Sequence, residues 1–142
     1  MFCNLCLTLL LVSNPVVSQS ATVSVPNYPE VTSANVPFYP GVAWSLKMGG
    51  TVELMISINK GAVVDARVIS APSQFLSVPS LATVKSWKFR SKERQSIYVK
   101  FVYVIQGEPT EKPETPRIEL DLPSLVKVTA RPFMPTSQRE VH

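Results

Sequence analysis

Few residues of this chain have side chains that could carry out chemistry, and their positions do not favour catalysis. Cys3 and Cys6 are the only cysteines, and both fall in an apolar segment at the N-terminus. The single histidine is the last residue, His142, while Glu53 and Asp65 fall on separate predicted strands with nothing to place them in one pocket. Acid–base, nucleophilic and thiol chemistry all need groups that converge. We therefore predict that the chain is not an enzyme and uses no cofactor or metal.

Basic side chains are concentrated in one stretch, balanced there only by Glu93. The stretch comprises Lys85, Lys88, Arg90, Lys92, Arg94 and Lys100. One interpretation is attraction to an acidic partner segment or to anionic envelope surfaces, and the other is a solvated helix end whose charges favour the helix dipole. The net charge of +4 is too mild to indicate nucleic-acid binding.

Three runs of alternating apolar residues predict three strands. In the first, residues 51–58, one face holds Val52, Leu54, Ile56 and Ile58. Asn59-Lys60-Gly61 follows, where Gly61 can take the positive φ of a tight hairpin. The second strand, residues 63–70, is expected to place Val64, Ala66 and Val68 on the core. The third, residues 96–106, is apolar on both faces, so it needs a cover or a pairing partner.

Two short helices are expected to position these strands. Pro40 can begin the first, residues 41–48, and Gly49-Gly50 should end it. Pro79-Ser80 is expected to begin the second, which carries an apolar stripe of Leu81, Ala82 and Val84 into Trp87. Tyr39 and Trp44 could form a ligand-stacking pair, but anchoring a helix on the sheet is the more usual role of such residues.

An apolar N-terminus and a proline-rich tail flank this block. Residues 1–20 resemble a secretory signal peptide, since the first 17 residues carry no charged side chain and the apolar run is short. This predicts a periplasmic or secreted chain; an uncleaved N-terminus would instead leave it membrane-associated. Residues 21–36 form an irregular lead-in. The tail, residues 107–142, begins as a charged linker, and its two alternating segments, 117–122 and 125–130, could add strands or form an extended arm.

The order of these features resembles the TonB C-terminal domain of energy transducers. The order is Tyr-Pro, short helix, glycine, strand, glycine turn, strand, helix ending in Trp-x-Phe, and long strand. The matching residues are Pro37, Tyr39, Pro40, Gly50, Val52, Gly61, Val63, Ser70, Leu81, Ala82, Val84, Trp87 and Phe89. Full transducers have a membrane anchor and a long proline-rich spacer, which this sequence does not show. We therefore expect a short secreted form.

The resemblance implies a binding mode in which an extended partner segment adds to the last strand of the sheet. An edge strand offers unpaired N–H and C=O groups to such a segment. The residues implied are Val36, Pro37, Tyr39, Gln95, Ser96, Ile97, Tyr98, Val99, Lys100 and Val102. Two alternatives stay open. The strand could pair with residues 118–122 of the chain's own tail, or with a second copy in a homodimer.

Together these observations predict an α+β domain at residues 37–106, with a three-stranded antiparallel sheet, two helices on one face and extra strands from the tail. Its expected function is that of a periplasmic protein-interaction module, which binds the N-terminal segment of an outer-membrane transporter or another envelope protein in TonB-dependent transport. The alternative is an envelope structural or assembly protein that uses the fold to oligomerise. Neither nucleic acid nor a stable transmembrane anchor is expected.

Overall fold

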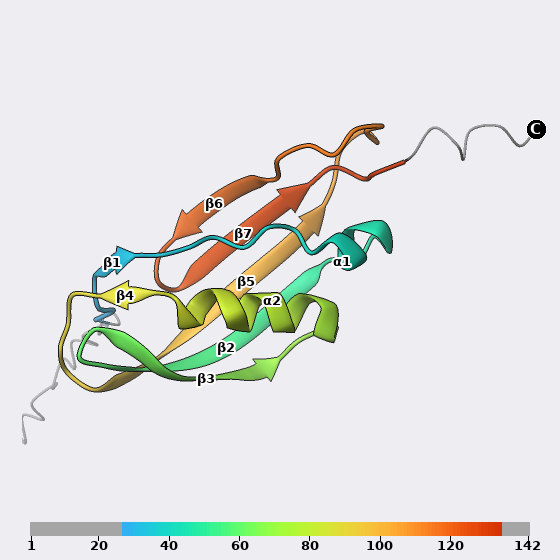
Figure 1. The fold of residues 1–142 in the computed structure, drawn as a ribbon. Helices are drawn as coiled ribbons and strands as arrows, with labels where there is room; N and C mark the ends of the chain where they lie inside the picture. The colour runs from blue at the N-terminus through green and yellow to red at the C-terminus, as the bar shows by residue number, and fades with distance from the viewer. Residues whose placement is uncertain (1–26, 135–142) are drawn as a thin grey trace, which may run out of the picture.

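The computed structural model describes residues 27–134, which fold into a mixed sheet with two helices on one face (Figure 1). Its sheet order is β1-β4-β3-β2-β5-β7-β6. The elements along the chain are β1 (Val31–Ser33), α1 (Gly41–Ser45), β2 (Gly50–Asn59), β3 (Ala62–Ser70), α2 (Gln74–Lys85), β4 (Lys88–Phe89), β5 (Gln95–Ile105), β6 (Arg117–Asp121) and β7 (Leu125–Ala130). The predicted signal peptide lies outside the described residues.

The expected α+β class is confirmed, but the expectation of a three-stranded sheet is wrong, because the sheet has seven strands in the described part of the chain. The three predicted strands are β2, β3 and β5, which pair antiparallel around β2. The tail adds β6 and β7, and β7 runs parallel to β5. The sheet is therefore mixed, and β2 and β5 form its centre.

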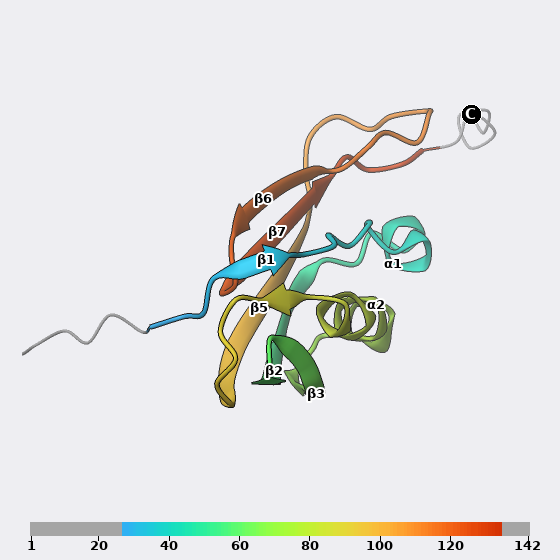
Figure 2. The same ribbon diagram turned by 60° about the vertical axis from the view of Figure 1, so that its left-hand side comes forward.

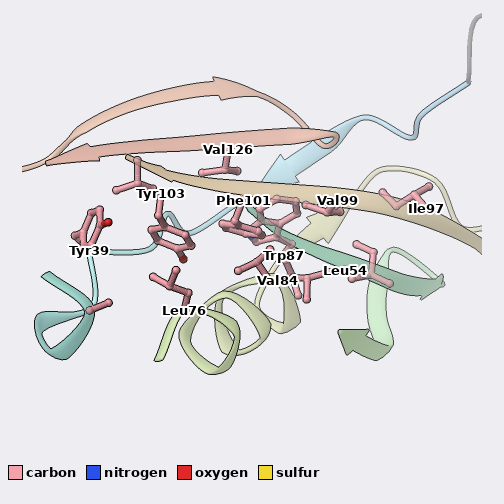
Figure 3. Close-up of a cluster of buried hydrophobic side chains, with 14 of the residues drawn as sticks. Tyr39, Leu54, Leu76, Val84, Trp87, Ile97, Val99, Phe101, Tyr103 and Val126 are labelled. Carbon is pink, nitrogen blue, oxygen red and sulfur yellow. The ribbon is translucent and has the colours of Figure 1, made fainter. Parts of the chain in front are cut away.

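A layer of apolar side chains between the sheet and the helices forms the core (Figure 3). Alternate residues of the central strands point into this layer, as the period of two in the sequence predicts. From the strands these are Val52, Leu54, Ile56 and Ile58 of β2, Ile97, Val99, Phe101 and Tyr103 of β5, and Val126, Val128 and Ala130 of β7. Leu76 and Val84 of α2, together with Trp87, close the layer from the other side.

The β2–β3 hairpin confirms the predicted turn at Gly61 but corrects the predicted face of Val64. Gly61 has a φ of 77°, and a Cβ there would lie 2.5 Å from the Phe89 carbonyl oxygen, so only glycine fits. Between Ser57 and Ile58 the register shifts, which leaves Val64 as an extra residue on β3. As a result Val64 is 55% exposed instead of facing the core.

Both helices differ in extent from the prediction. α2 begins at Gln74, not at Pro79, because the Ser73 side chain accepts a hydrogen bond of 3.1 Å from the Phe75 amide and caps the helix. Pro79 lies inside the helix. α1 ends at Ser45, before the expected glycine stop, and Lys47 has a φ of 53°. Figure 2 shows the two helices side by side on the same side of the sheet.

Candidate functional site: the free half of β5

Strand β5 has one continuous neighbour and one partial neighbour. β2 pairs with it antiparallel from Gln95 to Tyr103, whereas β7 pairs with it in parallel only from Lys100 to Ile105. The first five residues, 95–99, therefore have no strand beside them on the β7 side in the part of the chain that the structure describes. We call residues 95–99 the open edge.

The covered half of β5 is closed by a hairpin that belongs to the core. The Lys100 amide donates to the Ser124 carbonyl at 2.8 Å, and the Gln106 amide donates to the Ala130 carbonyl at 3.0 Å, so both ends of β7 are fixed. Val126 and Val128 are fully buried. Burial of one such side chain contributes about 1.5–3 kcal/mol, so this hairpin is not a loosely docked arm.

The strand beside β5 is not the tail segment that the sequence suggested. Residues 118–122 were one of the two alternative partners for this strand, but most of that segment lies in β6, which pairs with β7 and forms the outer edge of the sheet. The difference follows from side-chain burial. β7 turns two valines and an alanine into the core, whereas β6 carries Arg117, Glu119 and Asp121, whose charged groups stay exposed.

The direction of the backbone groups along the open edge follows from the β7 pairing. The N–H and C=O groups of one residue in a strand point to the same side, and successive residues alternate. Because the Lys100 amide points to the β7 side, the amides of Ser96 and Tyr98 also point there. Those of Ile97 and Val99 point to β2. The open edge therefore offers the donors and acceptors of Ser96 and Tyr98 to an added strand.

The side chains of the open edge are uncharged and fixed by the sheet. Ile97 and Val99 face the core and are buried, while Ser96 and Tyr98 face the other side. The Ser96 and Ser57 hydroxyl oxygens are 3.2 Å apart across the β2 pairing, and Tyr98 is 58% exposed. Charged residues, prolines and bulges protect sheet edges from pairing. None of these occurs between residues 95 and 99.

Val36, Pro37 and Tyr39 lie in the segment between β1 and α1, outside β5. Pro37 and Tyr39 are buried, and the Tyr39 ring packs edge-on against Tyr103 with 5.5 Å between ring centroids. Tyr103 is eight residues along β5 from Gln95, which is about 27 Å in a strand. The structure thus brings Gln95–Val99 together, but places Tyr39 near the other end of β5 (Figure 3).

Lys100 and Val102 of the predicted set are already paired. Both lie opposite β7 residues, Leu125 and Lys127 respectively, so neither offers a free backbone group on that side. The Lys100 ammonium group lies 3.4 Å from the Glu53 carboxylate across β2. At the other end of the open edge, the exposed Lys92 and Arg94 precede Gln95 in the connecting loop.

Two buried tyrosines are the titratable groups whose pKa is clearly shifted among the described residues. Burial, followed by the neighbouring Tyr103, raises the pKa of Tyr39 to about 12. Burial also raises the pKa of Tyr103 to about 12, against the opposing effect of its 2.6 Å hydrogen bond with Ser80. The Tyr39 hydroxyl donates to the Met48 carbonyl at 2.6 Å. Both phenols therefore stay neutral near pH 7 and brace the core.

The described residues were also compared with three other kinds of site: a metal site, a membrane-spanning helix and an aromatic stacking pair. Across residues 27–134 there is no cluster of three His, Cys, Asp or Glu side chains that could hold a metal ion. A search for membrane-spanning helices, limited to the same residues, finds none of sufficient length and apolarity. The candidate stacking pair does not form as such, because Tyr39 packs on Tyr103 and Trp44 packs on Phe133.

Comparison with known proteins gives one family. The model of the Gram-negative bacterial TonB protein C-terminal family matches residues 35–106, which is half of the chain. The match spans α1 through β5, so β1, β6 and β7 all lie outside it. A search of curated proteins finds no match.

Proposed function

Since the chain belongs to the TonB C-terminal family, we propose that it is a periplasmic interaction module that binds an extended segment of an outer-membrane transporter. The family is one of protein-interaction domains, and its members interact with outer-membrane transporters. The single observation that carries the proposal is the open edge. It is five uncharged residues of a central strand with unpaired backbone groups, where a partner strand can add.

The open edge suits strand addition better than the outer edge of β6 does. The even-numbered residues of β7 direct their backbone groups to β5, so its odd-numbered residues direct theirs to β6. Glu119 lies opposite Lys127 and therefore points its backbone groups to β7. The amides of Ile118 and Leu120 then point outward from the sheet. They lie between the three charged side chains of Arg117, Glu119 and Asp121, whereas the open edge has none. Charged edge strands resist pairing.

A peptide titration tests the proposal. The full chain is titrated with a synthetic peptide from the N-terminal segment of an outer-membrane transporter, and calorimetry measures the affinity. Tyr98→Pro removes an outward amide from the open edge and should abolish binding. Leu120→Pro removes an outward amide from β6, and its side chain is exposed to a similar extent, so it is the matched control and should bind like the parent chain.

A second measurement guards against misfolding of the proline variants. In the unmodified chain, the peptide should slow hydrogen exchange of the Ser96 and Tyr98 amides, because they become hydrogen-bonded. The amides of Ile118 and Leu120 should exchange as before. The proposal fails if the peptide protects β6 instead, or if it does not bind at high micromolar concentration.

A further inference from the structure

The outward face of α2 is apolar although no element of the described chain covers it. Leu76, Ser77, Ser80 and Val84 form the buried side of the helix. At 100° per residue the opposite side is formed by Phe75, Val78 and Ala82. All three are exposed, and Val78 is 64% exposed. The helix thus presents large apolar side chains to the outside.

The hydroxyl side chains in the body of α2 are directed inward or bond to the helix itself. Ser80 is fully buried and bonds to the Leu76 carbonyl at 2.7 Å and to the Tyr103 hydroxyl. The Thr83 hydroxyl donates to the Pro79 carbonyl at 2.8 Å. A helix on a solvated surface normally carries charged residues on its outer face. Here the only charged residue of the helix is Lys85, in its last turn.

Two more exposed apolar side chains lie at α1, one in the helix and one directly after it. Val42 and Leu46 are four residues apart, and they are 53% and 59% exposed. Phe38 lies before the helix and lines a pocket with Pro113 and Glu114 instead. α1 contacts α2, and Figures 1 and 2 show the two helices side by side. The helix face is defined here as Val42, Leu46, Phe75, Val78 and Ala82.

The charge of the helix layer has one sign. The sequence contains no Asp or Glu from residue 31 to residue 52, or from residue 66 to residue 92. These two stretches include both helices and the connections around them. Lys47 follows α1 and Lys85 ends α2, and both are exposed. The helix face is therefore apolar and flanked by positive charge, and the two stretches that form it contain no acidic residue. The carboxylate near α1 is that of Glu114, which lines the pocket at Phe38 and Trp44.

We propose that the helix face binds the surface of an anionic lipid bilayer. Apolar helix faces with flanking lysines bind at the boundary of headgroups and acyl chains, and binding grows with buried apolar area and anionic lipid content. A second copy fits less well, because two such faces would bring lysines together with no carboxylate to pair them. The inference does not rest on the proposed function, since the open edge belongs to β5 and the helix face to α1 and α2.

A polarity-sensitive fluorophore reports whether lipid contacts the labelled position itself. Binding of vesicles through the apolar N-terminal segment would not give this local signal. The full chain carries Cys3→Ser and Cys6→Ser, and one cysteine is introduced for labelling. Val78→Cys places the label on the helix face, and Leu120→Cys places it on β6 as the matched control. We expect vesicles of phosphatidylcholine with one-third phosphatidylglycerol to shift the emission of the label at position 78 to the blue, and not that at position 120.

Further variants then test apolar area and charge separately. Val42→Ser with Leu46→Ser should weaken the vesicle affinity of the chain labelled at position 78 by about tenfold. Val64→Ser removes a similarly exposed valine from β3 and should not change it. Lys85→Gln should weaken it roughly fivefold, since a lysine near an anionic surface contributes on that scale. High salt should weaken binding further.

Four outcomes overturn the proposal. One is no shift at position 78, and another is an equal shift at both label positions. A third is a shift without lipid that grows with protein concentration, which would assign the helix face to a second copy. The last is an equal shift with soluble polyglutamate in place of vesicles, which would indicate an acidic protein partner.

Discussion

The two halves of β5 share one neighbour and differ in the other. Both pair with β2, but residues 100–105 are covered by β7, whereas residues 95–99 have no strand on that side in the described structure. The covered half gains core packing from Val126 and Val128. The β6–β7 hairpin, which lies outside the family match, thus covers one half of the β5 edge and leaves the other half open to a partner. The predictions below test each half.

Loss of packing in the covered half should have the largest effect on stability. Val128 is fully buried, so Val128→Ala removes core contacts and leaves a cavity, and we expect a loss of about 2 kcal/mol. Urea unfolding measures it. Thr129→Ala, on the opposite face of the same strand, should cost less than about 0.5 kcal/mol. Equal small effects would mean that the hairpin is only loosely attached and that the two halves do not differ.

Alkaline pH should weaken the covered half through its buried phenol. The pKa of Tyr103 is about 12 in the folded chain against 10.0 for an ordinary tyrosine. Between these values the unfolded chain loses the proton first, so stability is complete below pH 10 and falls as the pH rises towards 12. Tyr103→Phe should make this fall shallower when unfolding is measured across that range. Tyr98→Phe in the open edge serves as the control, and a fall that Tyr103→Phe leaves unchanged would contradict the assignment.

Removal of charge from β6 should make its protected edge behave like the open edge. Arg117→Thr, Glu119→Thr and Asp121→Thr together remove the charged side chains of the strand. We expect concentration-dependent association in sedimentation at micromolar to millimolar protein, because an uncharged edge pairs readily. A monomeric triple variant at all concentrations would show that charge is not what distinguishes β6 from residues 95–99.

The ion pair where the two halves meet should matter least. The Lys100 ammonium group and the Glu53 carboxylate are 3.4 Å apart, and the two side chains are 56% and 39% exposed. Exposed pairs contribute roughly 0–1 kcal/mol, so Lys100→Gln should change the free energy of unfolding within that range, and less at high salt. A larger loss in thermal or urea unfolding would indicate that Lys100 also fixes the start of β7.

The sequence predicts the centre of this fold because local patterns decide it. Alternation fixes the inward faces of β2 and β5, and Gly61 reveals the hairpin through a conformation that few other residues adopt. The error at Val64 came from a bulge, which inserts one residue without any change in composition. The start of α2 was missed because Pro79 resembles a first-turn proline, whereas Ser73 provides the cap.

The tail shows where local reasoning ends. The sequence indicates that segments 117–122 and 125–130 alternate, but a period of two does not say which strand each one joins. The choice is made by contacts distant in the chain, where β7 supplies the apolar side chains that β5 needs and β6 does not. The placement of Tyr39 with Gln95 came from the resemblance, and the structure separates them, since Gln95 begins β5 whereas Tyr39 packs on Tyr103 near the end of that strand.

The hydrogen bond from Lys100 to Ser124 also limits the length of any ligand. A strand added to the open edge occupies the same line as β7 and meets the β6–β7 turn where that turn contacts Lys100. Five residues of strand span about 17 Å, so a longer segment must leave the plane of the sheet there. The β6–β7 turn thus limits the paired segment of a ligand to about five residues. Peptides trimmed to five residues should retain most of the affinity of longer ones.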